Sequence, residues 1–354
     1  MRILPGLVIP LIAYLCVGIA YAQTDLSGLG LSGLSSDVTI TASPENPTPR
    51  SVVTISVSSS LFDLTHSSIT IRANNVIVSQ GVGETSATIT TGSIGSPTNI
   101  SVNLIAPDGT QASNHITIIP TEVDLLLDSD SYVPPFYHGR ALPSAGTHIR
   151  AVALPYFKQS NGSFISSANI IYIWKEGGQV LGSVSGKGKS SVFLPAPPLF
   201  GTTVVEVDAQ SVDGNFSGSA SELVSAAAPR LLLYVDDPLF GIMYYNTIQA
   251  QTTLNVAQTT FAAVPYFAQA ISPNDQHLRY TWRLNGVSIP VSSVDQSEIT
   301  INAKNSNGSA ALGLSLDHTT NIFLNATGSW NITFLKTSGG NSQNSATNLF
   351  LGGN

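Results

Sequence analysis

The chain has 354 residues, a formal net charge of -7 and only 10% charged residues, against about 25% in an average soluble domain. The small number of basic residues excludes the positively charged surface that nucleic-acid binding requires. A hydrophobic content of 42% is too high for a chain that is disordered throughout. The length predicts two to three domains.

Residues 1–22 predict a signal peptide. Arg2 precedes an uncharged apolar stretch at residues 3–19, and residues 20–22 form an A-x-A cleavage motif, so we place the cut before Gln23. An uncleaved membrane anchor is the alternative, because the apolar stretch is nearly long enough to span a bilayer. We therefore expect export to the cell surface, a periplasm-like space or the medium, with no membrane span left after cleavage.

The only cysteine, Cys16, lies inside this segment. The mature chain is therefore predicted to lack disulfides, thiol catalysis and cysteine-ligated zinc, which favours a bacterial source for an exported protein. The sequence contains neither a G-x-S-x-G nor an H-E-x-x-H motif, so no catalytic residue is predicted. A hydrolase with accessory β-domains is a further alternative, but the strand pattern leaves no room for a separate catalytic domain.

Short runs of alternating apolar and polar residues follow a Gly/Ser/Leu-rich leader at residues 23–37. Residues 52–57, 68–72 and 100–104 are examples, each bounded by turn-forming residues. This pattern predicts half-buried antiparallel strands, and no window predicts an amphipathic helix. The predicted fold class is all-β.

Internal repetition divides the strands into domains. The sequence Pro-Tyr-Phe at residues 155–157 recurs at residues 265–267, and Trp174 is matched by Trp282. A spacing of about 108 residues corresponds to a whole domain. A weaker third copy has Ile71 at the tryptophan position. We predict three β-domains and a mobile tail, with boundaries at residues 38–121, 122–228, 229–335 and 336–354.

The repeated tryptophan motif carries a family resemblance. Tyr172-x-Trp174 and Tyr280-x-Trp282, each followed by a Gly-Gly or Asn-Gly turn, resemble the central hairpin of bacterial Ig-like and polycystic-kidney-disease-like domains. The resemblance implies tandem Ig-like antiparallel β-sandwiches, with each Trp between two sheets. The D-F-G-D-G sequence of the polycystic-kidney-disease type is absent. The layout is also similar to uncharacterised exported envelope proteins of candidate-phyla bacteria, some encoded near pilus genes.

Acidic residues gather at the predicted domain joints. Asp128 and Asp130 lie at one joint, and Asp236 and Asp237 lie at the next. Carboxylates at such positions suit calcium, which prefers oxygen ligands. Solvated turn carboxylates are the alternative, because no D-x-D-x-D-G run is present and Asp before Pro is an ordinary turn signal. No other cofactor is predicted.

Aromatic residues gather early in the second and third domains, at corresponding places. One interpretation is an exposed platform for a glycan or a partner chain. The other is that these segments seal the domain interface, which their repetition favours. The residues concerned are Tyr132, Phe136, Tyr137, Phe240, Tyr244 and Tyr245.

The sequence therefore predicts a non-enzymatic envelope or surface protein that acts as a structural or adhesive binding array. Its predicted partner is another envelope or surface protein, with pilus components among the candidates. The alternative is a carbohydrate-binding protein that uses the exposed aromatic residues.

Overall fold

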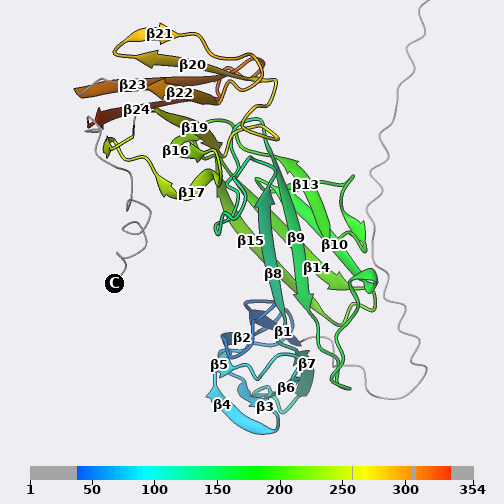
Figure 1. Ribbon diagram of the computed structural model, residues 1–354. Helices are drawn as coiled ribbons and strands as arrows, with labels where there is room; N and C mark the ends of the chain where they lie inside the picture. Colours follow the sequence, from blue (N-terminus) through cyan, green and yellow to red (C-terminus); the bar gives the residue numbers. More distant parts are fainter. Residues whose placement is uncertain (1–37, 257, 304–307, 336–354) are drawn as a thin grey trace, which may run out of the picture.

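A computed structural model describes residues 38–256, 258–303 and 308–335 (Figure 1). The predicted signal peptide, leader and tail lie outside these residues. The described part contains β-strands and one 3-10 turn at Ser167–Asn169, and none of its helices is long and apolar enough to cross a membrane. The predicted all-β fold class is confirmed.

The first group of strands forms two sheets with the orders β1-β2-β5 and β4-β3-β6-β7. All neighbours in these sheets are antiparallel, and one buried cluster that includes Val53, Ile55, Ile71 and Val102 draws on both sheets. This arrangement is an Ig-like β-sandwich. The strands are β1 (Val38–Ser43), β2 (Val52–Ser59), β3 (Ser68–Ala73), β4 (Val76–Val82), β5 (Ser86–Thr90), β6 (Thr98–Ile105) and β7 (Gln111–Ile118).

The second group repeats this arrangement. One sheet has the order β13-β9-β8, and the other has the order β11-β10-β14-β15 with β12 also paired to β10. The strands are β8 (Glu122–Ser129), β9 (His148–Tyr156), β10 (Ile170–Glu176), β11 (Gln179–Val180), β12 (Gly186–Lys187), β13 (Ser191–Pro195), β14 (Thr202–Ser211) and β15 (Ser217–Ser225).

The third group adds two strands to the same plan. Its sheets have the orders β17-β16-β19-β22 and β18-β24-β23-β20-β21, and β18 pairs with β24 in parallel. Figure 1 shows the three sandwiches following one another along the molecule. The strands are β16 (Arg230–Asp237), β17 (Gly241–Thr247), β18 (Gln251–Leu254), β19 (Gln258–Tyr266), β20 (Leu278–Leu284), β21 (Val287–Ile289), β22 (Glu298–Asn302), β23 (Gly308–His318) and β24 (Asn325–Phe334).

The tryptophan of the repeated motif lies in the core of its sandwich. Trp174 and Trp282 are both 0% exposed. Their indole N–H groups donate to the carbonyl oxygens of Lys189 (2.8 Å) and Gln296 (2.9 Å), which satisfies the one polar atom of each buried ring. In the first sandwich Ile71, also 0% exposed, occupies the matching place. The prediction of a core residue between the two sheets is confirmed.

The turn after this motif is also shared. Asn74, Gly177 and Asn285 each begin a two-residue turn with positive φ, at 48°, 54° and 52°. Such turns match the twist of the strands that they join and favour Asn and Gly. The side-chain oxygens of the two asparagines accept the N–H groups of Asn99 and Ala311 across the sheet, at 2.9 and 2.8 Å. The first sandwich thus shares this turn and its asparagine hydrogen bond with the third.

The segment between the first and second strand differs most among the sandwiches; we call it the first connection. It spans residues 44–51 in the first sandwich and residues 130–147 in the second, and in the third it contains β17 and β18. In each case it accepts one backbone N–H from the residue at or beyond the end of the last strand. The bonds are Thr121 to Pro47 (3.1 Å), Ala227 to Pro143 (2.7 Å) and Leu335 to Leu254 (3.0 Å).

Candidate binding groove between the second and third sandwiches

The first connection of the second sandwich packs against the third sandwich. The N–H of Tyr132 donates to the carbonyl of Ala268 (2.8 Å), and the N–H of Phe267 donates to the carbonyl of Tyr132 (2.7 Å). Apolar side chains from both sandwiches form one cluster around these bonds. It contains Tyr132, Val133, Leu142, Leu232, Tyr234, Ile242, Tyr244, Val264, Tyr266 and Phe267. The long connection therefore fixes the second sandwich to the third.

Tyrosine hydroxyls are paired inside this cluster. The hydroxyl oxygens of Tyr234 and Tyr266 lie 2.7 Å apart, and the ring centroids of Tyr234 and Tyr244 lie 5.5 Å apart. Burial raises the pKa of Tyr132, Tyr234 and Tyr244 above the ordinary value, because an apolar environment disfavours the phenolate. The cluster is therefore uncharged at neutral pH.

An open groove of about 760 Å³ lies beside this cluster. Tyr137 packs edge-on against Tyr266 and Phe267, with ring centroids 5.6 and 6.1 Å apart. None of the described lining residues is Asp, Glu, Lys or Arg. We call it the aromatic groove; its lining is Pro134, Pro135, Phe136, Tyr137, His138, Gly139, Phe240, Ile242, Met243, Tyr244, Tyr245 and Tyr266.

The six aromatic residues singled out from the sequence divide between the two interpretations. Tyr132 and Tyr244 are half-buried and contribute to the joint, as sealing residues do. Phe136, Phe240 and Tyr245 line the groove and are 89%, 79% and 78% exposed. Tyr137, which is 38% exposed, serves both surfaces. Exposed aromatic side chains gathered on one uncharged surface are typical of a binding site.

The backbone at Phe136 is unusual. Its φ of 64° places a bulky residue in the left-handed region, which costs about 1–2 kcal/mol. The turn that holds it includes the bond from the N–H of Tyr137 to the carbonyl of Pro134 (3.3 Å). Phe200 has a similar φ of 61° and is also 89% exposed, but it does not line the groove. It therefore provides an internal control for Phe136.

The aspartates of the calcium hypothesis accept local hydrogen bonds. The carboxylate of Asp130 accepts the backbone N–H of His148 (2.6 Å), and that of Asp237 accepts the N–H of Leu239 (2.8 Å). Asp128 accepts the N–H of Ser129, and Asp236 lies in β16. Within the described residues, no group of three or more His, Cys, Asp or Glu could hold a metal ion. The expected position was wrong for Asp130: it follows the far end of β8 and lines a cavity with His277 at the joint to the third sandwich, not at the joint to the first. Calcium binding itself stays a prediction, which thermal melting in EDTA and in calcium tests.

A second cavity of about 570 Å³ at the same joint was not expected from the sequence. It gathers Asp130 and His148 of the second sandwich with Asp275, His277 and His318 of the third. The rings of His277 and His318 are stacked, with centroids 5.5 Å apart. No spacing in the sequence predicts this group, because the three histidines come from separate elements that meet only at the joint.

His318 is connected to the joint through hydrogen bonds. Its Nδ1 accepts the backbone N–H of Asn321 (3.0 Å), and the side-chain amide of Asn321 donates to the carbonyl of Ala145 in the second sandwich (2.8 Å). Burial, together with the neighbouring His277, lowers the pKa of His318. The neutral ring is thus the form that supports this side of the joint.

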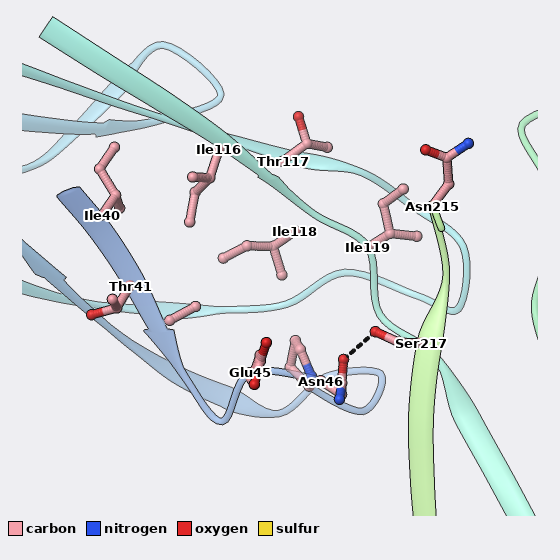
Figure 2. A pocket seen from close by; sticks show the side chains of 12 residues that line it. Ile40, Thr41, Glu45, Asn46, Ile116, Thr117, Ile118, Ile119, Asn215 and Ser217 are labelled. Carbon is pink, nitrogen blue, oxygen red and sulfur yellow. Dashed lines mark hydrogen bonds between the residues drawn. The ribbon is translucent and has the colours of Figure 1, made fainter. Parts of the chain in front are cut away.

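The joint between the first and second sandwiches is different. A cavity of about 480 Å³ lies there. Figure 2 shows Ile40, Ile116 and Ile118 on one side of it and Asn46 and Ser217 at its end. The Ser217 hydroxyl donates to the side-chain oxygen of Asn46. No aromatic residue is among the described residues that line this cavity. The aromatic groove is therefore the stronger candidate for a binding site.

Comparisons with known proteins give no family for this chain. No family model and no curated protein matches it. Similar solved structures include fibronectin(III)-like modules of Clostridium thermocellum CbhA, at 14% identity over 53% of this chain and 94% of that chain, with a TM-score of 0.26. The central fibronectin-III array of RIM-binding protein matches at 12% identity over 86% and 98% of the chains, with a TM-score of 0.29.

A third similar structure is Bacteroides ovatus SGBP-B of a mixed-linkage glucan utilization locus, in complex with a mixed-linkage heptasaccharide. It matches at 14% identity over 84% of this chain and 67% of that chain, with a TM-score of 0.24. Scores this low carry no functional argument, and the fold class rests on the sheets described above. The resemblances to polycystic-kidney-disease-like domains and to candidate-phyla envelope proteins stay predictions.

Proposed function

We propose that this protein is a non-enzymatic binding array of the cell envelope or cell surface, exported by its signal peptide, and that the aromatic groove contacts its partner. An envelope or surface protein is the proposed partner, with pilus components among the candidates. Three sandwiches in series hold the groove at a fixed place on an extended molecule, which suits a structural or adhesive role.

The observation that carries this proposal is the exposure of Phe136, Phe240 and Tyr245 around one groove whose described lining contains no Asp, Glu, Lys or Arg. Aromatic side chains bury much area at a small cost in conformational entropy, and they dominate the energetics of protein interfaces. Because Phe136 comes from the second sandwich and the other two from the third, the groove depends on the fixed joint.

A glycan is the second candidate ligand. It is favoured by the absence of Asp, Glu, Lys and Arg among the described lining residues and by the tyrosines Tyr137 and Tyr245, which line the groove. A neutral oligosaccharide would place ring faces on the exposed aromatic side chains and hydroxyls on these polar groups.

The test is binding of the labelled mature chain, residues 23–354, to intact cells of the source organism. We expect the triple variant Phe136→Ala/Phe240→Ala/Tyr245→Ala to bind at least tenfold more weakly, since hot-spot aromatics contribute about 2 kcal/mol or more each. The matched control is Phe193→Ala/Phe200→Ala/Ile271→Ala, which removes exposed apolar side chains outside the groove. Equal loss in both variants would contradict the proposal, and so would absence of cell binding by the unmodified chain.

A further inference from the structure

The second cavity at the second joint, which we call the histidine cavity, places three imidazole rings where two sandwiches meet. Its titratable lining residues are Asp130, His148, Asp275, His277 and His318. His148 pairs with Asp130 of its own sandwich, and His277 pairs with Asp275 of its own, each through Nδ1 at 3.0 Å. Both pairs persist whether the joint is open or closed. His318 is therefore the histidine whose titration can distinguish the two forms.

His318 supports a loop through the nitrogen that an added proton would occupy. Its Nδ1 accepts the backbone N–H of Asn321 at 3.0 Å and that of Thr320 at 3.3 Å. The neutral ring that does this carries its hydrogen on Nε2, whereas both nitrogens of the charged ring carry one. A protonated Nδ1 can no longer accept either N–H group, so the loop loses this support.

Asn321 is the residue of this loop that contacts the second sandwich. Its side-chain amide donates to the carbonyl of Ala145 (2.8 Å) and to the side-chain oxygen of Gln269 (2.9 Å). The two sandwiches approach closely here, because a Cβ at Gly146 would lie 2.5 Å from the amide nitrogen of Asn321. Displacement of Asn321 thus removes a hydrogen bond that crosses the joint.

Four consecutive residues connect this contact to the aromatic groove. Gln269 lines the histidine cavity, and Tyr266 lines the aromatic groove. Between them, the N–H of Phe267 and the carbonyl of Ala268 form the two backbone bonds with Tyr132. Because one short segment carries the contacts on both sides of the joint, a movement at the histidine cavity reaches the groove.

We propose that His318 is a pH switch for the second joint: its protonation in acid releases the contact through Asn321, and the third sandwich turns about the Tyr132 bonds, which changes the width of the aromatic groove. The described residues of the apolar cluster around these bonds include no His, Asp or Glu, so this side of the joint remains as the pivot. The inference concerns the joint itself and goes beyond the proposed function, because it holds for any ligand of the groove.

The direction of the switch follows from proton linkage. Burial and, after it, the neighbouring His277 lower the pKa of His318 from its ordinary value of 6.5, against opposing effects of Asp275 and of a hydrogen bond to the backbone of Gln269. The closed joint therefore binds this proton less readily than an open joint, in which water solvates the charged ring. The closed form is favoured above the ordinary value, and acid favours the open form.

The experiment measures distances between pairs of spin labels in the purified mature chain, residues 23–354. This chain lacks cysteine, so introduced cysteines are labelled selectively. Arg140→Cys/Leu239→Cys places exposed labels beside the aromatic groove, and Ser113→Cys/Ser191→Cys places exposed labels across the first joint as a control. Between pH 7.5 and pH 5 we expect a second distance at the groove, with the ratio of open to closed joints rising about tenfold or more. The control distance should not change.

Two substitutions identify the group responsible. His318→Asn keeps an acceptor for the N–H of Asn321 but does not titrate, so the groove distance should stay constant over this pH range. His277→Asn removes a neighbouring charge that opposes protonation of His318, so the transition should move to higher pH. The matched control is His115→Asn at an exposed position of β7, which should behave as the unmodified chain. Melting at pH 7.5 confirms that each variant is folded.

Three outcomes would overturn the inference. They are a groove distance that does not respond to pH, a response that persists unchanged in His318→Asn, and equal changes across both joints. If His318→Asn does not fold, an unshifted transition in His277→Asn overturns the inference instead. Because the measurement uses the purified chain without a ligand, a failure of cell binding counts against the proposed function alone.

Discussion

The two joints of the array use different contacts. At the first joint, the hydroxyl of Thr121 donates to the carbonyl of Ser217 (2.5 Å), and the hydroxyl of Ser217 donates to Asn46. At the second joint, an apolar cluster built around Tyr132 and Tyr266 accompanies the hydrogen bonds. A net hydrogen bond contributes about 0.5–1.5 kcal/mol, whereas each well-buried large apolar side chain contributes about 1.5–3 kcal/mol. The second joint is therefore the stronger one.

The difference follows from the length of one connection. Residues 44–51 connect β1 to β2; Pro47 accepts the N–H of Thr121, and the contact with the second sandwich is the polar one from Ser217 to Asn46. Residues 130–147 make the matching bond through Pro143 and still extend far enough to cover the third sandwich. In a series of similar sandwiches, lengthening a single connection can thus convert a polar contact into a fixed joint that carries a groove.

The largest expected effect concerns coupling across the joints. Trp282→Ala should destabilise the third sandwich by about 3–5 kcal/mol, as large-to-small changes of a buried Trp do. Because the second joint is apolar, the second sandwich should also melt at a lower temperature, while the first is unaffected. Calorimetry with separate transitions measures this. The control is Ile71→Ala, for which we expect loss of the first sandwich alone. Three independent transitions in both variants would contradict the ranking of the joints.

Close-packed glycines at each joint allow a finer comparison. A Cβ at Gly146 would lie 2.4 Å from the side-chain oxygen of Gln269, across the second joint. Gly146→Ala should therefore push aside the side-chain ends of Gln269 and Asn321 and cost about 1 kcal/mol, the lower end of the range for overpacking, in addition to the cost of its φ of 90°. Gly162→Ala is the control, because Gly162 has a φ of 88° and nothing within 4 Å of a Cβ. Chemical denaturation measures the free energy of unfolding of both variants. Equal decreases would contradict the close packing around Gly146.

The first joint has the equivalent pair. A Cβ at Gly95 would lie 2.6 Å from the carbonyl oxygen of Lys158, and Gly109 has nothing within 4 Å of a Cβ. Among the described residues, no apolar cluster comparable to that of the second joint spans the first, so separating the two sandwiches there costs less free energy. We expect Gly95→Ala to lower the free energy of unfolding more than Gly109→Ala does. This difference should be smaller than the difference between Gly146→Ala and Gly162→Ala. The same denaturation series gives both differences, and the reverse order would contradict the comparison.

The sandwiches could be predicted because their determinants are local. Alternation identified the strands, and the Y-x-W motif placed Trp174 and Trp282 in the core. Because a proline has no N–H to donate to a ladder, we expect Pro155 at an edge or a bulge. It lies in β9, the middle strand of its sheet, but beyond residues 148–152, where β9 pairs with β13. The proline therefore has a strand on one side only, which is the physical condition that the expectation described.

The candidate site could be predicted only in part. The sequence identified Phe136 and Phe240 as members of equivalent aromatic segments, but their meeting in one groove depends on how two sandwiches dock. The same holds for His148, His277 and His318, which share a cavity although no motif links them. Interdomain geometry is set by long-range packing, for which single-sequence patterns contain no periodic signal.

The smallest predicted effect is a pH dependence of the second joint. The pKa of His318 is lowered in the folded protein, first by burial and then by His277, from an ordinary value of 6.5. Above this value the ring is neutral in both states, so its contribution to stability is fully present. As the pH falls below it, the unfolded chain binds the proton more readily than the folded chain, so stability is lost. We expect a lower melting temperature of the third sandwich at pH 5 than at pH 7.

His318→Asn isolates this contribution. The asparagine oxygen can accept the N–H of Asn321 in place of Nδ1 but does not titrate, so the link through Asn321 to Ala145 should persist at both pH values. The control is His115→Asn on β7, an exposed position whose change should leave the pH dependence intact. A third sandwich whose melting temperature falls equally in all three proteins between pH 7 and pH 5 would contradict the role of His318.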